Sequence, residues 1–322
     1  MFKKILIYNS GGGLGDAIQL FPLILSLKNH FKDCRFFYLG SHQNHFNEKL
    51  KEFNINLDTI DLGVEYFGFR WWHLLKIKKK FYEKNLEKFD LVIDLQSKLR
   101  NTLILKQIPS NYFYSSTFSF IFCTKKNKYI NNKKNLSLDI LSNLEKFFNT
   151  KIKKIDFSLN TLEKKYIYES KKLLPGNNYI GFSLTQGNAY RKKSWHIDNF
   201  INLAKNYISK GKKTVFFVEK KETKIVSYIK KNIPGALFPE HESNISSPAL
   251  VTALASRLEK AFTIDNGVMH MISLSKIPMV VLFGPTNSEK FAPDRKNVKI
   301  FDSKKMYKSN DINKITIKDV LK

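Results

Sequence analysis

The sequence has little of several features that would point directly to a function. Among its 322 residues there are only two cysteines, Cys34 and Cys123, too few for a disulfide framework or a cysteine metal site. An Asp-x-Asp motif that could hold a divalent metal is absent, and we expect no metal site. No apolar run reaches membrane-spanning length and a strand begins almost at the N-terminus, so we expect a cytoplasmic protein.

Acidic residues are also scarce. Lys and Arg number 55 against 28 Asp and Glu, a formal net charge of +27, and most of the cations are lysines. Nucleic-acid-binding modules usually combine Arg with aromatic side chains; we find no such module and expect no nucleic-acid partner. Two interpretations of the charge remain open. It forms a solvated surface, or it attracts polyanions such as nucleotide diphosphates and anionic lipid headgroups.

A glycine-rich turn near the N-terminus is the most distinctive stretch. It joins an aliphatic run, residues 4–8, to apolar residues at helical spacing between 14 and 27. The glycines at 11–13 and 15 match neither the dinucleotide-binding fingerprint nor a phosphate-binding P-loop. The predicted second strand, 35–39, also lacks the terminal acid that would bind a ribose. These departures disfavour a nicotinamide or flavin cofactor.

Asp16 ends this turn and has two interpretations. It is either the N-cap of the following helix, with Gln19 completing a capping box, or a catalytic carboxylate. Pro22 falls inside the apolar run and should kink a single helix there.

Short apolar runs alternate with helical patterns along both halves of the chain, which predicts an α/β fold of two doubly wound parallel sheets. We place the domain boundary in a polar stretch, giving domains 1–165 and 175–322. The predicted strands are 4–8, 35–39, 58–62, 90–95, 179–184, 214–218, 260–264 and 279–283.

Residues 66–82 combine two tryptophans with a lysine cluster. We favour an ordinary helix that packs its aromatic side chains inward. The alternative is an interfacial segment that places aromatics at headgroup depth and lysines on anionic lipid.

In the second half, polar residues follow successive predicted strands. Asp265-Asn266-Gly267 and the 284–287 loop lie where ligands bind in open α/β sheets. Asp265 or Asn266 could simply cap the next helix, and His270 could simply be packed. The loop 185–193 ends in Lys193, which is either a surface lysine or a charge that neutralises a diphosphate.

Taken together, these blocks resemble glycosyltransferase family 9, the heptosyltransferases of lipopolysaccharide core synthesis. The matching stretches follow the family's order: Gly13-Leu14-Gly15-Asp16 with Pro22, Asp94-Leu95-Gln96 with Arg100, Lys193-Ser194-Trp195, Asp265 to His270, and Leu282 to Thr286.

The resemblance implies a GT-B fold, with two Rossmann-like domains facing a central cleft, and an inverting, metal-independent sugar transfer with Asp16 as general base. The domain 1–165 would bind the acceptor and 175–322 the donor, a nucleotide-diphosphate sugar, ADP-linked, with no further cofactor. The implied donor residues are Thr185, Gln186, Lys193, Glu222 (or Glu219), Asp265, Asn266, Gly267 and His270; the implied acceptor residues are Gly12, Gly13, Gly15, Gln96 and Arg100.

The expected acceptor is a lipid-anchored glycan at the inner face of the inner membrane, which would involve peripheral contact with anionic lipid. Two alternatives remain open: a nucleotide-sugar epimerase of the same architecture, and a non-catalytic nucleotide-sugar-binding protein.

Overall fold

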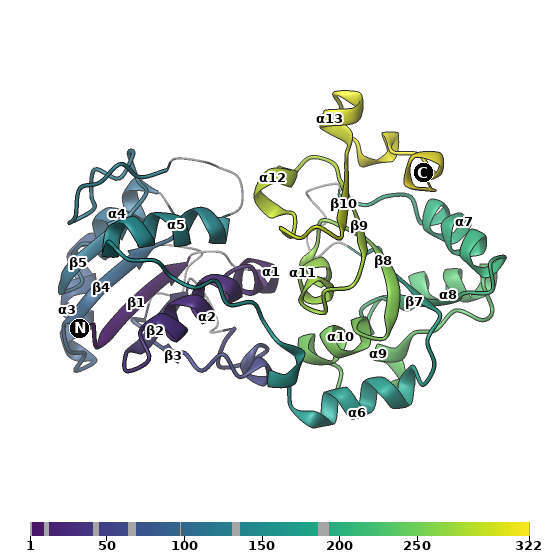
Figure 1. Cartoon of the computed structure of the whole chain (residues 1–322), viewed down its shortest axis with the longest axis horizontal. Helices are drawn as coiled ribbons and strands as arrows, with labels where there is room; N and C mark the ends of the chain where they lie inside the picture. Colours follow the sequence, from purple (N-terminus) through teal and green to yellow (C-terminus); the bar gives the residue numbers. More distant parts are fainter. Residues whose placement is uncertain are drawn as a thin grey trace. The chain divides into compact units, whose positions relative to one another are not determined.

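The computed structural model describes residues 2–9, 13–40, 45–63, 69–96, 98–130, 136–185 and 193–321. The chain divides into two compact units, Met1–Phe157 and Ser158–Lys322, each built around its own sheet (Figure 1). Helix α6, Lys164–Leu173, lies within the sequence-based boundary region but belongs to the second unit, where it packs against α10, Pro248–Ala255.

The first unit contains a parallel five-stranded sheet in the order β3-β2-β1-β4-β5. The expected strands are present, and one further strand, β5, lies in a stretch for which we predicted none. The strands are β1 Lys4–Asn9, β2 Arg35–Gly40, β3 Asp58–Thr59, β4 Phe89–Asp94 and β5 Ser110–Ser115.

Helices cover both faces of this sheet. Leu6 and Tyr8 of β1 join the core formed with α3, His73–Glu83, and α4, Leu99–Leu105. Ile5 and Ile7 are equally buried and point to the other face, because side chains alternate along a strand. There α2, Phe21–His30, packs against α5, Leu136–Phe148.

The expected single, kinked helix after the glycine turn is two helices. A short α1, Leu14–Ile18, ends before α2 begins at Phe21. Pro22 lies in the first turn of α2, where its missing N–H would have had no intrahelical partner in any case. The proline therefore starts a helix instead of kinking one.

The favoured interpretation of the 66–82 segment is wrong for three of its aromatic side chains. Residues 64–68 lie outside the described part of the chain. Trp71, Trp72 and Tyr82 are all more than half exposed, whereas Ile77 and Phe81 of α3 are buried. The helix exists and turns Ile77 and Phe81 inward, whereas Trp71 and Trp72, in the turn before it, stay about half exposed.

The second unit repeats the architecture with strand order β10-β9-β8-β6-β7, again all parallel. Its strands are β6 Tyr179–Ser183, β7 Lys213–Phe217, β8 Leu258–Ile264, β9 Met279–Phe283 and β10 Val298–Asp302, the last of which we did not predict. The longer helices, besides α6 and α10, are α7 Ile197–Ile208, α8 Thr223–Asn232 and α11 Gly267–Leu274; α9 Pro239–Glu242, α12 Ser288–Phe291, α13 Ser303–Tyr307 and α14 Ile317–Leu321 are short.

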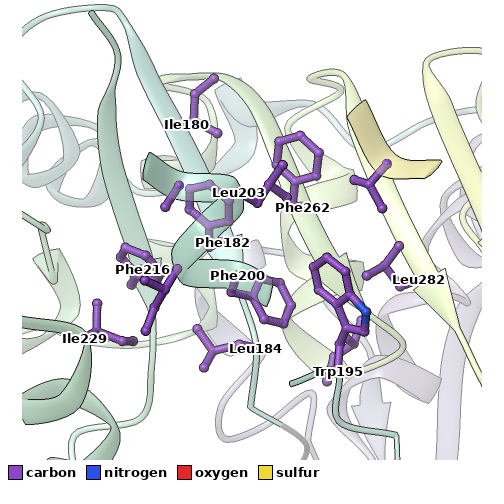
Figure 2. Close-up of a cluster of buried hydrophobic side chains, with 14 of the residues drawn as sticks. Ile180, Phe182, Leu184, Trp195, Phe200, Leu203, Phe216, Ile229, Phe262 and Leu282 are labelled. Carbon is purple, nitrogen blue, oxygen red and sulfur yellow. The ribbon is translucent and has the colours of Figure 1, made fainter. Parts of the chain in front are cut away.

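A row of phenylalanines runs across the middle of this sheet (Figure 2). Phe182 of β6 is in register with Phe216 of β7 and Phe262 of β8, and its ring stacks on theirs at centroid distances of 5.1 and 5.6 Å. Trp195 joins the same core; its indole N–H donates to Ile315 O at 2.8 Å. This core fixes the strand ends that carry the polar loops described next.

Candidate functional site

Each sheet has a point where the strand order reverses. In the first unit the chain adds β2 and β3 on one side of β1 and then crosses to β4, so the reversal lies between β1 and β4. In the second unit it lies between β6 and β8. Ligands of open α/β sheets bind outside the carboxyl ends of the strands at such points, because the flanking loops part there.

In the first unit, two amide side chains meet at this point. Asn9 ends β1, Gln96 follows β4, and Gln96 Nε2 donates to Asn9 Oδ1 at 2.5 Å. Asn9 is buried and Gln96 is half-buried. The pair ties the two loops together, so any group bound there would meet a fixed polar floor.

A buried carboxylate, that of Asp94, accepts a hydrogen bond from the Gln96 backbone and so helps to fix its position. Asp94, the last residue of β4, accepts from the Gln96 backbone N–H at 2.9 Å and from the hydroxyls of Thr102 and Ser115 at 2.5 and 2.8 Å. Burial raises the pKa of Asp94, and these donors oppose the shift by stabilising the carboxylate. Arg100, in the first turn of α4, contributes to lowering the pKa of His73 on α3, after burial and Lys76.

Asp16 lies on the turn that leaves β1, but it is not the helix N-cap. Gly13 occupies the N-cap position of α1, and Asp16 is the third helical residue; its Oδ2 accepts from the Gly13 N–H at 3.3 Å. Burial raises the pKa of Tyr38 on β2, a hydrogen bond with Asn9 lowers it, and the charge of Asp16 raises it. The half-buried Asp16 carboxylate thus lies within electrostatic reach of a group that contacts the Asn9–Gln96 pair.

In the second unit, Asn266 joins the two loops at the reversal point. Its Oδ1 accepts from the Met269 N–H at 2.8 Å and caps α11, as one of our two interpretations expected. Its Nδ2 donates to Ser183 Oγ at the end of β6 and to Thr185 O in the following loop, both at 2.9 Å. Asn266 therefore sets the position of the loop after β6 against the start of α11.

Lys193 is not a surface lysine. Its ammonium lies 2.5 Å from Asp265 Oδ2, and the two side chains are only 14% and 8% exposed. Trp195, two residues later, is fixed in the core by its bond to Ile315 O. The ion pair with Asp265 and the anchoring of the neighbouring Trp195 thus both fix the Lys193 ammonium at the end of β8.

The first amides of α11 belong to the residues that follow Asp265 and Asn266 in the chain. Gly267 and Val268 are half-exposed, and as the first two helical residues they precede the capped N–H of Met269. Such amides, at the positive end of a helix dipole, suit a phosphate group. His270, on the next position of the same helix, is buried.

The remaining expected residues that the structure describes lie at the same carboxyl edges. Glu222 is the half-buried N-cap residue of α8, beyond the end of β7, and Thr185 is half-buried after β6. Gly13 is exposed and Gly15 is buried in α1. Gly12 and Gln186 lie outside the described residues.

Sequence reasoning missed Asn9, Ser183 and Tyr38, and it included Asp94 only as part of a motif. Asn9, Asp94 and Ser183 are polar residues that end the buried strands β1, β4 and β6, at the sheet edge where ligands bind. That position was the available signal. Nothing in the sequence places Tyr38 beside Asn9, because the contact joins neighbouring strands through side chains.

The described residues contain no cluster of three or more His, Cys, Asp or Glu side chains arranged to bind a metal ion. None of their helices combines the length and apolar character needed to cross a bilayer.

Comparison with known proteins identifies the family. The model of glycosyltransferase family 9 (heptosyltransferase) matches residues 76–320. The chain belongs to this family. As a family 9 member it is a glycosyltransferase, and the expected GT-B fold of two units with parallel Rossmann-like sheets is confirmed.

Individual relatives are distant. Lipooligosaccharide heptosyltransferase 2 of Campylobacter jejuni subsp. jejuni serotype O:2 is 24% identical over 289 residues, which are 87% of this chain and 81% of the relative. A family 9 glycosyltransferase of Veillonella parvula is 19% identical with a TM-score of 0.71, covering 99% of this chain and 95% of that one. The E. coli heptosyltransferase WaaC, solved with ADP-2-deoxy-2-fluoro heptose, is 13% identical with a TM-score of 0.68, covering 99% and 98%.

Proposed function

We propose that this family 9 glycosyltransferase moves a heptose from an ADP-linked donor to a lipopolysaccharide-core glycan, with inversion at the anomeric carbon and without a metal ion. The observation that carries this proposal is the family match over residues 76–320, which includes Lys193 and the Asp265 to His270 segment. Asp16 precedes the matched residues, so its role rests on its position after β1 at the reversal point of the first sheet.

The relatives support the choice of donor and acceptor. The Campylobacter jejuni protein is a lipooligosaccharide heptosyltransferase, and the E. coli enzyme was solved with an ADP-heptose analogue. A lipid-linked acceptor would place the reaction at the cytoplasmic face of the inner membrane.

In the proposed mechanism, the Asp16 carboxylate takes the proton of the acceptor hydroxyl as that oxygen attacks the anomeric carbon. General-base assistance of this kind contributes about 10²–10⁴-fold to a rate. The new glycosidic bond forms while the bond from the anomeric carbon to the diphosphate breaks, so negative charge gathers on the leaving diphosphate.

The second unit would stabilise that charge. Lys193 supplies a fixed ammonium, and the amides of Gly267 and Val268 supply hydrogen bonds at the positive end of α11. We assign the remaining donor contacts to Thr185, Gln186, Glu222, Asp265, Asn266 and His270, and the acceptor contacts to Gly12, Gly13, Gly15, Gln96 and Arg100.

A thermal-shift screen tests the donor assignment. Purified protein is heated with ADP, GDP, UDP, CMP or NAD, because a ligand that binds only the folded state raises its melting temperature. We expect ADP to stabilise most. A preference for NAD, or no shift with any nucleotide, would contradict the proposal.

Acceptor dependence separates transfer from the alternatives. A transferase consumes ADP-heptose to form glycosylated product only when the acceptor is present. Conversion of the donor sugar without acceptor would indicate an epimerase, and binding without turnover under either condition would indicate a non-catalytic protein.

A further inference from the structure

The outer face of α3 exposes large apolar side chains. Trp71 and Trp72, in the turn before the helix, are 55% and 53% exposed; Leu75 is 86% and Tyr82 is 56% exposed. Residues 71, 75 and 82 are four and seven apart, so they lie along one side of a helix. Soluble surfaces usually carry such side chains singly, so a strip of four of them along one side of a helix and its preceding turn indicates a binding surface.

This exposure is built into the fold, because both ends of the turn are anchored. The Phe69 ring stacks on Tyr8 of β1 at 4.9 Å with an interplanar angle of 9°. His73 is buried, and its Nδ1 accepts from the Arg70 backbone N–H at 2.9 Å. The indoles between these two anchors cannot turn inward without breaking one of them.

The inner face of α3 has no room for them either. Ile77 and Phe81 are fully buried in the core shared with β1 and β4. Rotating the helix to cover Leu75 would expose these two side chains instead. The apolar strip therefore stays exposed because Ile77 and Phe81 already occupy the buried face of α3.

Cations flank the strip along its length. Residues 70–84 contain six Lys or Arg and one acid, Glu83, which lies 3.8 Å from Lys79 in an exposed pair. Lys76 and Lys78 are exposed between the apolar positions. An exposed ion pair of this kind contributes little to stability. With six cations against one acid, the strip keeps a strong positive charge.

We propose that this face of α3, formed by Trp71, Trp72, Leu75 and Tyr82 with Lys76, Lys78 and Lys79, docks the protein on an anionic lipid bilayer. Indole rings favour the headgroup region, where the ring is buried and the N–H stays near water. Each lysine near an anionic surface adds electrostatic attraction. Charge complementarity thus selects anionic lipid as the occupant.

The docking surface does not depend on the proposed transfer reaction, and vesicle binding measures it without a sugar substrate. The full-length protein is mixed with phosphatidylcholine vesicles, either pure or containing about 30 mol% phosphatidylglycerol, and bound protein is collected by sedimentation. We expect binding to the anionic vesicles only, with release at high salt.

Tryptophan emission reports on the surface directly. The chain has three tryptophans, and the third, Trp195, is buried in the second unit. A blue shift on addition of anionic vesicles would therefore come from Trp71 or Trp72. Sedimentation without a blue shift would contradict docking by this face.

Matched variants locate the contact. We expect Trp71→Ser/Trp72→Ser and Lys76→Glu/Lys78→Glu each to lower the vesicle partition coefficient at least tenfold. Helix α6 offers controls of the same character: Tyr168→Ser, an aromatic residue 72% exposed, and Lys164→Glu/Lys171→Glu, two exposed lysines. Both controls should bind like the wild type.

Two further results would overturn the proposal. Equal loss of binding in the α6 and α3 variants would indicate attraction by overall charge alone. A dimer in gel filtration that Trp71→Ser/Trp72→Ser converts to a monomer would assign the strip to a second copy of the chain. Because all substituted side chains are exposed, unchanged melting temperatures should accompany every variant.

Discussion

At the scale of single residues, the same chemical device occurs in both units. A side-chain amide crosses the point where the strand order reverses: Gln96 to Asn9 in the first sheet, and Asn266 to Ser183 and Thr185 in the second. An amide can donate and accept at once, so it can join two loops whose backbones are too far apart to pair. In each unit, the loops of the proposed substrate site are thus joined by hydrogen bonds of a side-chain amide.

The first prediction separates the charge of Lys193 from its structural role. Lys193→Met should weaken ADP binding about 10–100-fold, since a hydrogen bond to a charged group contributes roughly 1.5–3 kcal/mol. Asp265→Asn, which also removes the ion pair, should leave ADP affinity nearly unchanged, because we assign Asp265 to the sugar of the donor and not to ADP. Isothermal titration calorimetry measures both; equal losses would mean that the ion pair only holds the loop.

The second prediction concerns Glu240 of α9. Burial raises the pKa of Glu240 to about 7, and the charge of Glu219 raises it as well, against lowering by Ser246 and Lys220. Because folding raises the pKa of Glu240, the stability that this group contributes to the folded protein is fully present below the unshifted pKa of 4.5 and is lost as pH rises through about 7.

Glu240→Gln cannot ionise and should escape this loss. Between pH 5 and pH 8 the melting temperature of the variant should therefore rise relative to the wild type, by the equivalent of up to about 3 kcal/mol. Melting curves at the two pH values provide the measurement. A difference that does not change with pH would show that Glu240 does not titrate in this range.

At the scale of elements, the loop after β9 depends on a glycine for space. A Cβ added to Gly284 would lie 2.9 Å from Ile312 Cβ and 3.0 Å from the Asn310 carbonyl oxygen, and the second contact is with backbone. Gly235 offers a matched control, since a Cβ there meets nothing within 4 Å.

We therefore expect Gly284→Ala to destabilise the protein by about 2 kcal/mol through overpacking, and Gly235→Ala to change stability little. Thermal melting of the two variants tests this. Equal melting temperatures would show that the segment around Ile312 yields without cost.

The elements that could be predicted from sequence are those with a continuous apolar run. β1, β4, β6 and β9 are mostly apolar and almost entirely buried, and their apolar runs marked them clearly. The two strands we missed lie at sheet edges. β5 is rich in tyrosine and serine, and β10 contains an exposed lysine and ends in an aspartate, so neither resembles a buried parallel strand.

Contacts that depend on tertiary structure were out of reach of sequence reasoning. For residues 66–82 we favoured a helix, and α3, His73–Glu83, lies in the described part of this segment. Which aromatic rings face the core depends on the anchors at Phe69 and His73, which are side-chain contacts. For the same reason the sequence marked Lys193 as a candidate but not its burial against Asp265.

At the scale of the whole molecule, family membership and fold agree with the sequence-based expectation because the polar blocks occur in order along both units. The net charge of +27 is spread over both halves of the chain, so charge by itself does not identify a binding surface. The α3 face is distinguished by its exposed indoles, which α6, an equally lysine-rich helix, lacks.

The transfer reaction with Asp16 as general base is the central claim, and Asp16→Asn tests it most directly. The substitution keeps the shape of the side chain and an oxygen that can accept from the Gly13 N–H, so α1 should form as before. Transfer of heptose from ADP-heptose to a lipopolysaccharide-core acceptor that the wild-type protein glycosylates is followed by mass spectrometry, with ADP affinity measured in parallel. We predict that the transfer rate falls about 10²–10⁴-fold while ADP affinity is retained. An Asp16→Asn enzyme that transfers heptose at the wild-type rate would contradict the account.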